Sequence, residues 1–271
     1  MFEEMGRNKM KVVILAGGRG TRISEESIVR PKPMIEIGGK PILWHIMKIY
    51  SYYGFHEFII CLGYKGYMIK EYFADYYLHT SDVTFDFRQE NRMTVHNNVS
   101  EPWRVTLVDT GLDSQTGCRI KQVQRYIGNK SFMLTYGDGV SDVDLNALIE
   151  AHRSGGKDAI VTMTAVQPGG RFGVLDIEQN SNQISRFVEK AKEDGGWVNG
   201  GFMVLEPEVF QYVQEDESCI FERAPLETIA FNGGLHAYKH KGFWQCMDTQ
   251  RDKLVLEKMW MDGHAPWCLW K

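Results

Sequence analysis

Apolar residues gather in short, nearly uninterrupted runs along the chain, and several of these runs end at a glycine. Residues 12–16 are all apolar, and residues 58–62 and 132–136 form two further runs of this kind. A strand that is buried on both faces carries such a run, whereas a half-exposed strand alternates apolar and polar residues. The pattern therefore predicts three strands of a parallel sheet.

Between the first two of these strands the apolar residues take helical spacing. Ile42, Ile46, Ile49 and Tyr53 recur on one helix face, and Pro41 suits a first helical turn. Strand, helix and strand in this order form a βαβ unit.

The alternation continues to the end of the chain. It predicts a helix over 145–153, strands over 159–165 and 184–187, and an amphipathic helix over 251–261. We therefore expect an α/β fold, with a Rossmann-like, mixed and mostly parallel sheet flanked by helices. Short strand-like pieces at 83–87 and 105–108, set among polar loops, indicate a smaller appended β/α region.

Length and linkers bear on the number of domains. With 271 residues the chain is long for one domain and short for two, and no clear linker divides it. We expect a single domain over residues 10–271. Residues 1–9 are polar and precede a second methionine, so we expect them to be a disordered extension or a remnant of cloning.

Charge and cysteine usage narrow the function classes. The formal net charge of −4 gives no bulk reason to expect nucleic acid or an anionic membrane as a partner. The five cysteines are widely spaced without a CxxC pair, so we expect reduced thiols in a cytoplasm and neither a zinc site nor a disulfide framework. No signal core and no run of 18 apolar residues occurs.

The first predicted strand runs directly into a loop that contains Gly17, Gly18 and Gly20. Glycine lets the backbone bend sharply and approach a ligand, so that amide groups can point at phosphate oxygens or a base edge. Arg22 follows, with a planar cation suited to a polyphosphate. Lys32 stands between two prolines that stiffen the backbone, as expected if it holds a charge near a phosphate.

This loop fits neither of two common phosphate-binding patterns. It lacks the Gly-Lys-Ser/Thr of a P-loop, and its glycine spacing departs from the dinucleotide fingerprint G-x-G-x-x-G. The alternative is an ordinary strand-to-loop turn with solvated basic residues. The combination with Arg22 and the proline-flanked lysine favours phosphate binding.

The glycine loop, followed by Arg-Pro-Lys-Pro-Met at residues 30–34, resembles the sugar-1-phosphate nucleotidyltransferases, which make nucleotide sugars. Similarity extends over nearly the whole chain from residue 10. Within this family the chain is most similar to the branch of glucose-1-phosphate cytidylyltransferases. The similar segments include residues 24–26, 38–45, 101–103, 105–111, 170–173 and 242–245, and the middle segments are the ones that favour this branch.

The resemblance implies that the substrates are CTP and glucose 1-phosphate. The sugar phosphate would attack the α-phosphorus of CTP in line, with release of pyrophosphate. Because this nucleophile is already an anion, alignment and charge neutralisation suffice for catalysis. The implied catalytic residues are Arg22, Lys32 and Asp138. The implied nucleotide-binding residues are Leu15, Ala16, Gly17, Gly18, Gly20, Thr21, Arg22, Lys32 and Arg119.

Two aspartates are candidates for binding Mg²⁺. Asp138 lies between two glycines at the end of a buried strand, where open α/β sheets bind ligands. Asp248 comes from a distant part of the chain, and two carboxylates can bind one Mg²⁺ whose other ligands are phosphate oxygens and water. For Asp248, which precedes a predicted helix, a helix cap is the alternative. We interpret Asp142 and Asp144 as turn and cap residues of the helix that follows them.

The sugar phosphate is expected further along the chain. Glu189 can accept hydrogen bonds from sugar hydroxyls while Lys190 reaches the phosphate, although such a pair is often a solvated surface pair. Residues 199–201 precede the apolar run 202–205, and we expect them to form a loop at the edge of that strand. Asn199 in this loop can offer its amide to a sugar hydroxyl or simply form a turn. The resemblance implies that Gly173, Glu189, Lys190 and Asn199 bind the sugar phosphate. Lys121 is a weaker candidate, together with Arg119, for a contact with base or triphosphate.

Three alternatives stay open at this point. One is the same chemistry with UTP, dTTP or GTP. Another is a non-catalytic regulator that binds a nucleotide sugar, and the third is a dinucleotide-dependent oxidoreductase, which the glycine spacing disfavours. The resemblance also implies that the appended region serves sugar binding and oligomerisation, and that the protein is a homo-oligomer, with a hexamer as one form.

Overall fold

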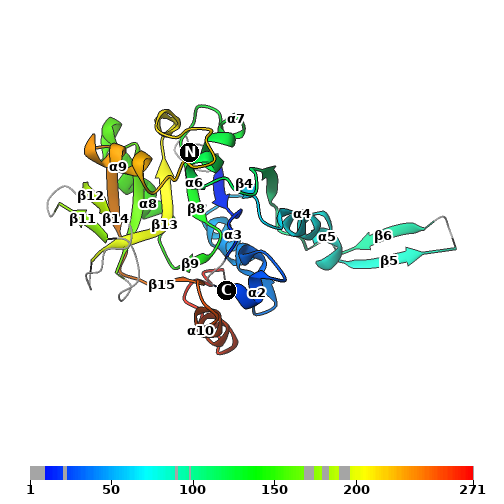
Figure 1. Cartoon of the computed structure of the whole chain (residues 1–271). Helices are drawn as coiled ribbons and strands as arrows, with labels where there is room; N and C mark the ends of the chain where they lie inside the picture. The colour runs from blue at the N-terminus through cyan, green and yellow to red at the C-terminus, as the bar shows by residue number, and fades with distance from the viewer. Residues whose placement is uncertain are drawn as a thin grey trace, which may run out of the picture.

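The computed structural model of the chain describes residues 10–20, 23–88, 91–97, 99–167, 174–178, 183–188 and 196–270. Its centre is a seven-stranded sheet (Figure 1). In spatial order the strands are β14 (Leu235–Lys239), β10 (Val161–Val166), β13 (Val198–Leu205), β8 (Phe132–Tyr136), β1 (Val12–Leu15), β4 (Glu57–Leu62) and β7 (Arg104–Asp109).

The sheet is mixed but mostly parallel, as predicted. Strand β1 pairs in parallel with β4 and β8, and β4–β7 and β10–β14 are also parallel pairs. Only β13 runs antiparallel within this sheet, between β10 and β8. The carboxyl ends of β1 and β8 and the amino end of β13 therefore lie at one edge of the sheet.

Helices cover both faces of the sheet. Successive strand residues point to opposite sides, so each face carries apolar side chains that the helices bury. Val12 and Ile14 pack into one core, whereas Val13 and Leu15 pack into the other. The first core includes apolar residues of α3 (Ile42–Tyr52), α4 (Gly66–Ala74), α8 (Leu145–Ser154) and α10 (Gln250–Met261). The second core includes apolar residues of α6 (Thr116–Gln122), α7 (Gln124–Ile127), η4 (Pro207–Gln211) and α9 (Ala224–Phe231).

Smaller elements extend from this body. An antiparallel ribbon, β5 (Asp82–Asp86) with β6 (Arg92–His96), projects beyond α4 and α5 (Tyr76–His79) (Figure 1). The other pairs and short helices are β2 (Glu36–Ile37) with β3 (Lys40–Pro41), β9 (Gly139–Ser141) with β15 (Trp244–Cys246), β11 (Val174–Ile177) with β12 (Ile184–Val188), α2 (Ser24–Ser27), η2 (Lys32–Met34) and η3 (Gly156–Asp158). A role for such appended elements in sugar binding or oligomerisation stays a prediction.

The predicted strands and helices are found with small shifts at their ends. One local expectation was wrong: Asn199, Gly200 and Gly201 belong to strand β13 and do not form a loop before it. Asn199 pairs with Ala165 of β10, and Gly201 adopts a φ of 83°, which an L side chain rarely allows. Glycine thus lets the strand continue where the sequence suggested a break. In the described part of the chain, no helix is long and apolar enough to cross a membrane.

The carboxyl-terminal segment packs back onto α3. His45 of α3 is fully buried, and its Nδ1 accepts a hydrogen bond from Trp267 Nε1 at 3.3 Å. Nε2 of His45 therefore carries the proton and donates to the carbonyl of Ile37 at 2.8 Å. Burial lowers the pKa of His45 to about 4, and the hydrogen bond to Ile37 opposes this shift in part. Neutral His45 links α3, the β2–β3 turn and the carboxyl terminus.

Candidate active site

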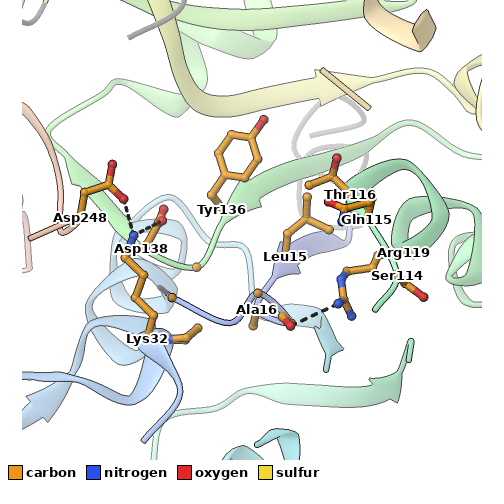
Figure 2. Close-up of a pocket in the computed structure, with 15 residues that line it drawn as sticks. Leu15, Ala16, Lys32, Ser114, Gln115, Thr116, Arg119, Tyr136, Asp138 and Asp248 are labelled. Carbon is orange, nitrogen blue, oxygen red and sulfur yellow. Dashed lines mark hydrogen bonds and ion pairs between the residues drawn. The ribbon is translucent and has the colours of Figure 1, made fainter. Parts of the chain in front are cut away.

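A pocket of about 450 Å³ opens at the carboxyl edge of β1 and β8 (Figure 2). Open α/β sheets bind ligands at this edge, and the volume suits a small-molecule ligand. The residues that line the pocket are Leu15, Ala16, Gly17, Gly18, Gly20, Lys32, Pro33, Ser114, Gln115, Thr116, Arg119, Tyr136, Gly137, Asp138 and Asp248.

The glycine loop forms one wall of this pocket and is held from behind. The carbonyl of Gly17 accepts hydrogen bonds from the Tyr64 amide at 3.0 Å and from Arg119 Nη2 at 3.2 Å. Gly20 has a φ of 63°, and its carbonyl accepts a hydrogen bond from Ser27 Oγ at 2.7 Å. A Cβ on Gly17 would lie 2.2 Å from the Arg119 guanidinium, so only glycine permits this approach.

Arg119 is buried behind the loop and clamps it to the ends of two neighbouring strands. Burial lowers the pKa of this guanidinium, and nearby Cys61 opposes that effect in part. The side chain donates to the carbonyls of Gly17, Leu62, Gly111 and Leu112 and to Thr110 Oγ1, at 2.6 to 3.5 Å. Arg119 thus positions the loop, and its predicted contact with the nucleotide stays a prediction. Lys121 does not line this pocket, because its Nζ donates to the carbonyl of Phe210 at 2.8 Å.

Lys32 and two aspartates meet at the opposite wall of the pocket (Figure 2). The Lys32 Nζ lies 2.7 Å from Asp138 Oδ2 and 2.6 Å from Asp248 Oδ1. Burial alone would lower the pKa of Lys32, but the two carboxylates outweigh it and leave the pKa raised. Lys32 is therefore protonated throughout the physiological range. One cation and two anions give the cluster a formal charge of −1 before any ligand binds.

Local backbone structure presents each carboxylate to the pocket. Asp138 follows β8 in a Gly-Asp-Gly turn, and its carbonyl accepts a hydrogen bond from the Met247 amide at 2.8 Å, which brings the two aspartates together. The alternative for Asp248, a helix cap, is wrong, since Thr249 caps α10 in a capping box with Asp252. The Asp248 side chain is thus directed to Lys32. Asp144, by contrast, caps α8 as predicted.

The donor set fits one divalent cation. The two carboxylates already converge on a single cation, the ammonium of Lys32, and their side chains remain 31% and 20% exposed towards the pocket. Among the described residues no group of three histidine, cysteine or acidic side chains could hold a metal. Two carboxylates leave most of an octahedral shell to phosphate oxygens and water, which is the usual arrangement for Mg²⁺ at a nucleotide.

A hydrogen-bonded group that the sequence analysis missed stands beside this cluster. Tyr136, the last residue of β8, donates its hydroxyl proton to Glu222 Oε1 at 2.5 Å and accepts from Asn199 Nδ2 at 3.1 Å. Glu222 Oε2 accepts from Thr116 Oγ1 at 2.5 Å. The only signal in the sequence was the place of Tyr136 directly before Gly-Asp-Gly. Nothing local to Glu222 marks it.

The predicted site residues fall partly within and partly outside the described part of the chain. Thr21, Arg22, Gly173, Glu189 and Lys190 lie outside the described residues. The other predicted residues line the pocket, except for the weaker candidate Lys121 and for Asn199, which reaches Tyr136 in the pocket wall.

Comparisons with known proteins show the family of the chain. A family model described as nucleotidyl transferase matches residues 11–262. The chain is 57% identical to a glucose-1-phosphate cytidylyltransferase of Salmonella typhi over 263 residues, which is 97% of this chain and all of the relative. It is 45% identical to a probable glucose-1-phosphate cytidylyltransferase of Bacillus subtilis, over 96% of this chain and all of the relative.

Solved structures have the same fold. The structure of HddC from Yersinia pseudotuberculosis superposes with a TM-score of 0.73 at 26% identity, covering 93% of this chain and 99% of that one. A UDP-glucose pyrophosphorylase complexed with UDP-glucose superposes with a TM-score of 0.71 at 19% identity, covering 94% and 99%. At that identity the second likeness supports the fold alone.

Proposed function

The chain belongs to the nucleotidyl transferase family, and we propose that it transfers a cytidylyl group from CTP to α-D-glucose 1-phosphate. The products are CDP-glucose and pyrophosphate. Relatives with this activity in their names match the chain over almost its entire length. The observation that carries the proposal is the meeting of Lys32, Asp138 and Asp248 opposite the glycine loop in one pocket.

The chemistry follows from the charges that this pocket supplies. A phosphate oxygen of the sugar phosphate attacks the α-phosphorus of CTP, and the bond to the pyrophosphate oxygen breaks. Lys32 stays protonated and neutralises negative charge near the α-phosphate. The glycine-loop amides and the buried Arg119 behind them fix the nucleotide in place. Such a reaction needs alignment and electrostatic stabilisation but no general base.

Mg²⁺ is the proposed cofactor, held by Asp138 and Asp248. When bound, it would supply positive charge to the phosphate oxygens of the transition state. The two carboxylates face Lys32 from different parts of the chain, so they can hold a cation beside the lysine. Asp138 thereby takes part both in binding the metal and in orienting Lys32.

The remaining site residues are proposals that rest on the family pattern. Arg22 would neutralise the departing pyrophosphate, and Thr21 would contribute to the nucleotide loop. Glu189 would accept from the sugar hydroxyls, while Lys190 and Gly173 would contact the sugar phosphate.

The assembly and the compartment are also proposals. The family pattern supports a homo-oligomer, with a hexamer as one form, and substrates rather than nucleic acid or membrane as partners. The free state of all five cysteines agrees with a reducing cytoplasm.

Pyrophosphate release tests the proposed function directly. The purified protein is mixed with glucose 1-phosphate, Mg²⁺ and one of CTP, UTP, dTTP, ATP or GTP. Of the five nucleotides, only CTP is expected to give pyrophosphate release, and EDTA should abolish this release. Release with another nucleotide would keep the chemistry and reject CTP as substrate. The absence of release with every nucleotide and with other sugar phosphates would favour a non-catalytic binding protein.

A further inference from the structure

We propose that the ring of Tyr136, tethered by Glu222 and Asn199, is the platform against which the hexose of the sugar phosphate binds, so that Tyr136 helps to select the hexose. This inference rests on the proposed function and adds a specificity-determining residue to it. Glu222 acts through Tyr136 and is a positioning residue.

Tyr136 lies between the glycine loop and Asn199 in the order of the strands. Its strand, β8, lies between β1, which leads into the glycine loop, and β13, which carries Asn199. In Figure 2 the ring stands between the carboxylates of Asp138 and Asp248 on one side and Leu15 and Thr116 on the other. A nucleotide on the glycine loop would therefore have Tyr136 at the end of the pocket where its α-phosphate meets the sugar phosphate.

The ring is held in one orientation from three directions. Its hydroxyl donates to Glu222 at 2.5 Å and accepts from Asn199 at 3.1 Å. Its ring edge packs on Gly201, where an added Cβ would lie 2.7 Å from Cδ2 of the tyrosine. A tyrosine whose hydroxyl already has these two partners contributes mainly the face of its ring to the pocket.

Each tether is itself fixed. Glu222 Oε2 accepts from Thr116 Oγ1 at 2.5 Å, and that hydroxyl oxygen accepts from the Phe221 amide at 2.9 Å. Asn199 Oδ1 accepts from the Gly201 amide at 2.8 Å, and one N–H of Nδ2 donates to Tyr136. The second N–H of the amide can then donate to a sugar hydroxyl. A rigid aromatic face beside an amide donor suits a hexose, whose ring offers C–H groups to the face and hydroxyls to the amide.

The test separates binding of the two substrates. KM for glucose 1-phosphate, KM for CTP and kcat are measured for the wild type and for Tyr136→Phe, Tyr136→Leu and Glu222→Gln. Tyr136→Phe keeps the ring but loses both hydroxyl bonds, so KM for glucose 1-phosphate should rise about 3- to 10-fold. Tyr136→Leu loses the aromatic face, and a rise of about tenfold or more is expected. KM for CTP should stay within about twofold of the wild type, because these substitutions leave the nucleotide-binding loop unchanged.

A matched control addresses a merely structural role. Glu206 accepts hydrogen bonds from Ser131 Oγ at 2.8 Å, next to the other end of β8 and away from the pocket. Glu206→Gln should lower the Tm without changing either KM, whereas Glu222→Gln should raise KM for glucose 1-phosphate. Selectivity for glucose 1-phosphate over galactose 1-phosphate should fall in the Tyr136 and Glu222 variants only.

Three results would overturn the inference. A rise in KM for CTP alone would place the ring against the nucleotide. An unchanged KM for both substrates in Tyr136→Leu would make the network structural. Equal changes in KM for glucose 1-phosphate in Glu206→Gln and Glu222→Gln would mean that both substitutions act through the general stability of the fold. In each case the wild type would still make CDP-glucose, whereas a wild type without that activity would reject the proposed function itself.

Discussion

The ammonium of Lys32 lies 2.6 Å from a carboxylate oxygen of Asp248, although the two residues are 216 positions apart in the chain. The same nitrogen lies 2.7 Å from Asp138. The lysine therefore occupies a position between two carboxylates that the proposed metal would also have to approach. Charge balance in this cluster underlies the first two predictions.

Replacing Lys32 should abolish most turnover. Lys32→Met keeps most of the unbranched side chain but removes the charge near the α-phosphate. The loss of one well-placed electrostatic contact should lower kcat on the order of 10²–10³-fold. Pyrophosphate release at saturating CTP and glucose 1-phosphate measures the effect. A kcat near that of the wild type in a folded variant would mean that Lys32 has no catalytic role.

The same variant should bind a divalent cation more tightly in the absence of nucleotide. In Lys32→Met, Asp138 and Asp248 lose their shared partner and leave an uncompensated pair of negative charges. Calorimetric titration with Mn²⁺ should show increased affinity over the wild type. Asp248→Asn in the same background should remove the gain. If Lys32→Met binds Mn²⁺ no better than the wild type, the two carboxylates do not form a shared cation site.

Asp138 and Asp144 make a matched pair of aspartates on either side of β9. Asp138→Ala should abolish turnover without a large change in stability. Asp144 caps α8 by accepting from two backbone amides, so Asp144→Ala should cost about 0.5–2 kcal/mol of stability and leave kcat unchanged. Thermal unfolding and steady-state kinetics on both variants check this. The reverse pattern would exchange the roles assigned to the two residues.

Arg119 and Lys121 differ in their expected effect on the nucleotide. Arg119→Lys retains the charge but loses the planar fork that holds Gly17, Leu62 and Gly111. Losing one charged hydrogen bond of about 1.5–3 kcal/mol should raise KM for CTP roughly 10- to 100-fold. Lys121→Met lies outside the pocket and should leave this KM unchanged. Equal KM values for CTP in the two variants would mean that Arg119 does not support the glycine loop.

Acid should destabilise the protein through His45. Because the pKa of His45 falls from 6.5 to about 4 on folding, the folded state favours the neutral imidazole. The contribution of neutral His45 to the free energy of unfolding is fully present above pH 6.5 and is lost as the pH falls towards 4. The total loss is on the order of 3 kcal/mol. Urea unfolding between pH 4 and 7.5, followed by tryptophan fluorescence, measures the slope. His45→Gln cannot titrate, so its stability should depend less on pH, and an unchanged slope would contradict the assignment.

Part of this architecture was readable from local pattern. The runs at 12–16, 58–62 and 132–136 have the composition of strands buried on two faces, and each became a strand of the central sheet. The glycines after the first strand indicated a backbone that approaches a ligand. The two prolines beside Lys32 indicated that its backbone is held rigidly. Such properties depend on a residue and its near neighbours, so the sequence alone determines them.

Other features were settled by the tertiary structure. Whether Asp248 caps a helix or faces the pocket depended on Thr249 taking the cap. The partnership of Tyr136 with Glu222 joins residues 86 positions apart, and nothing near Glu222 in the sequence signals it. The antiparallel course of β13, which brings Asn199 to the pocket edge, follows from pairing with two other strands. Local periodicity fixes which residues are buried, but only packing of the whole sheet decides which buried or half-buried polar groups find each other.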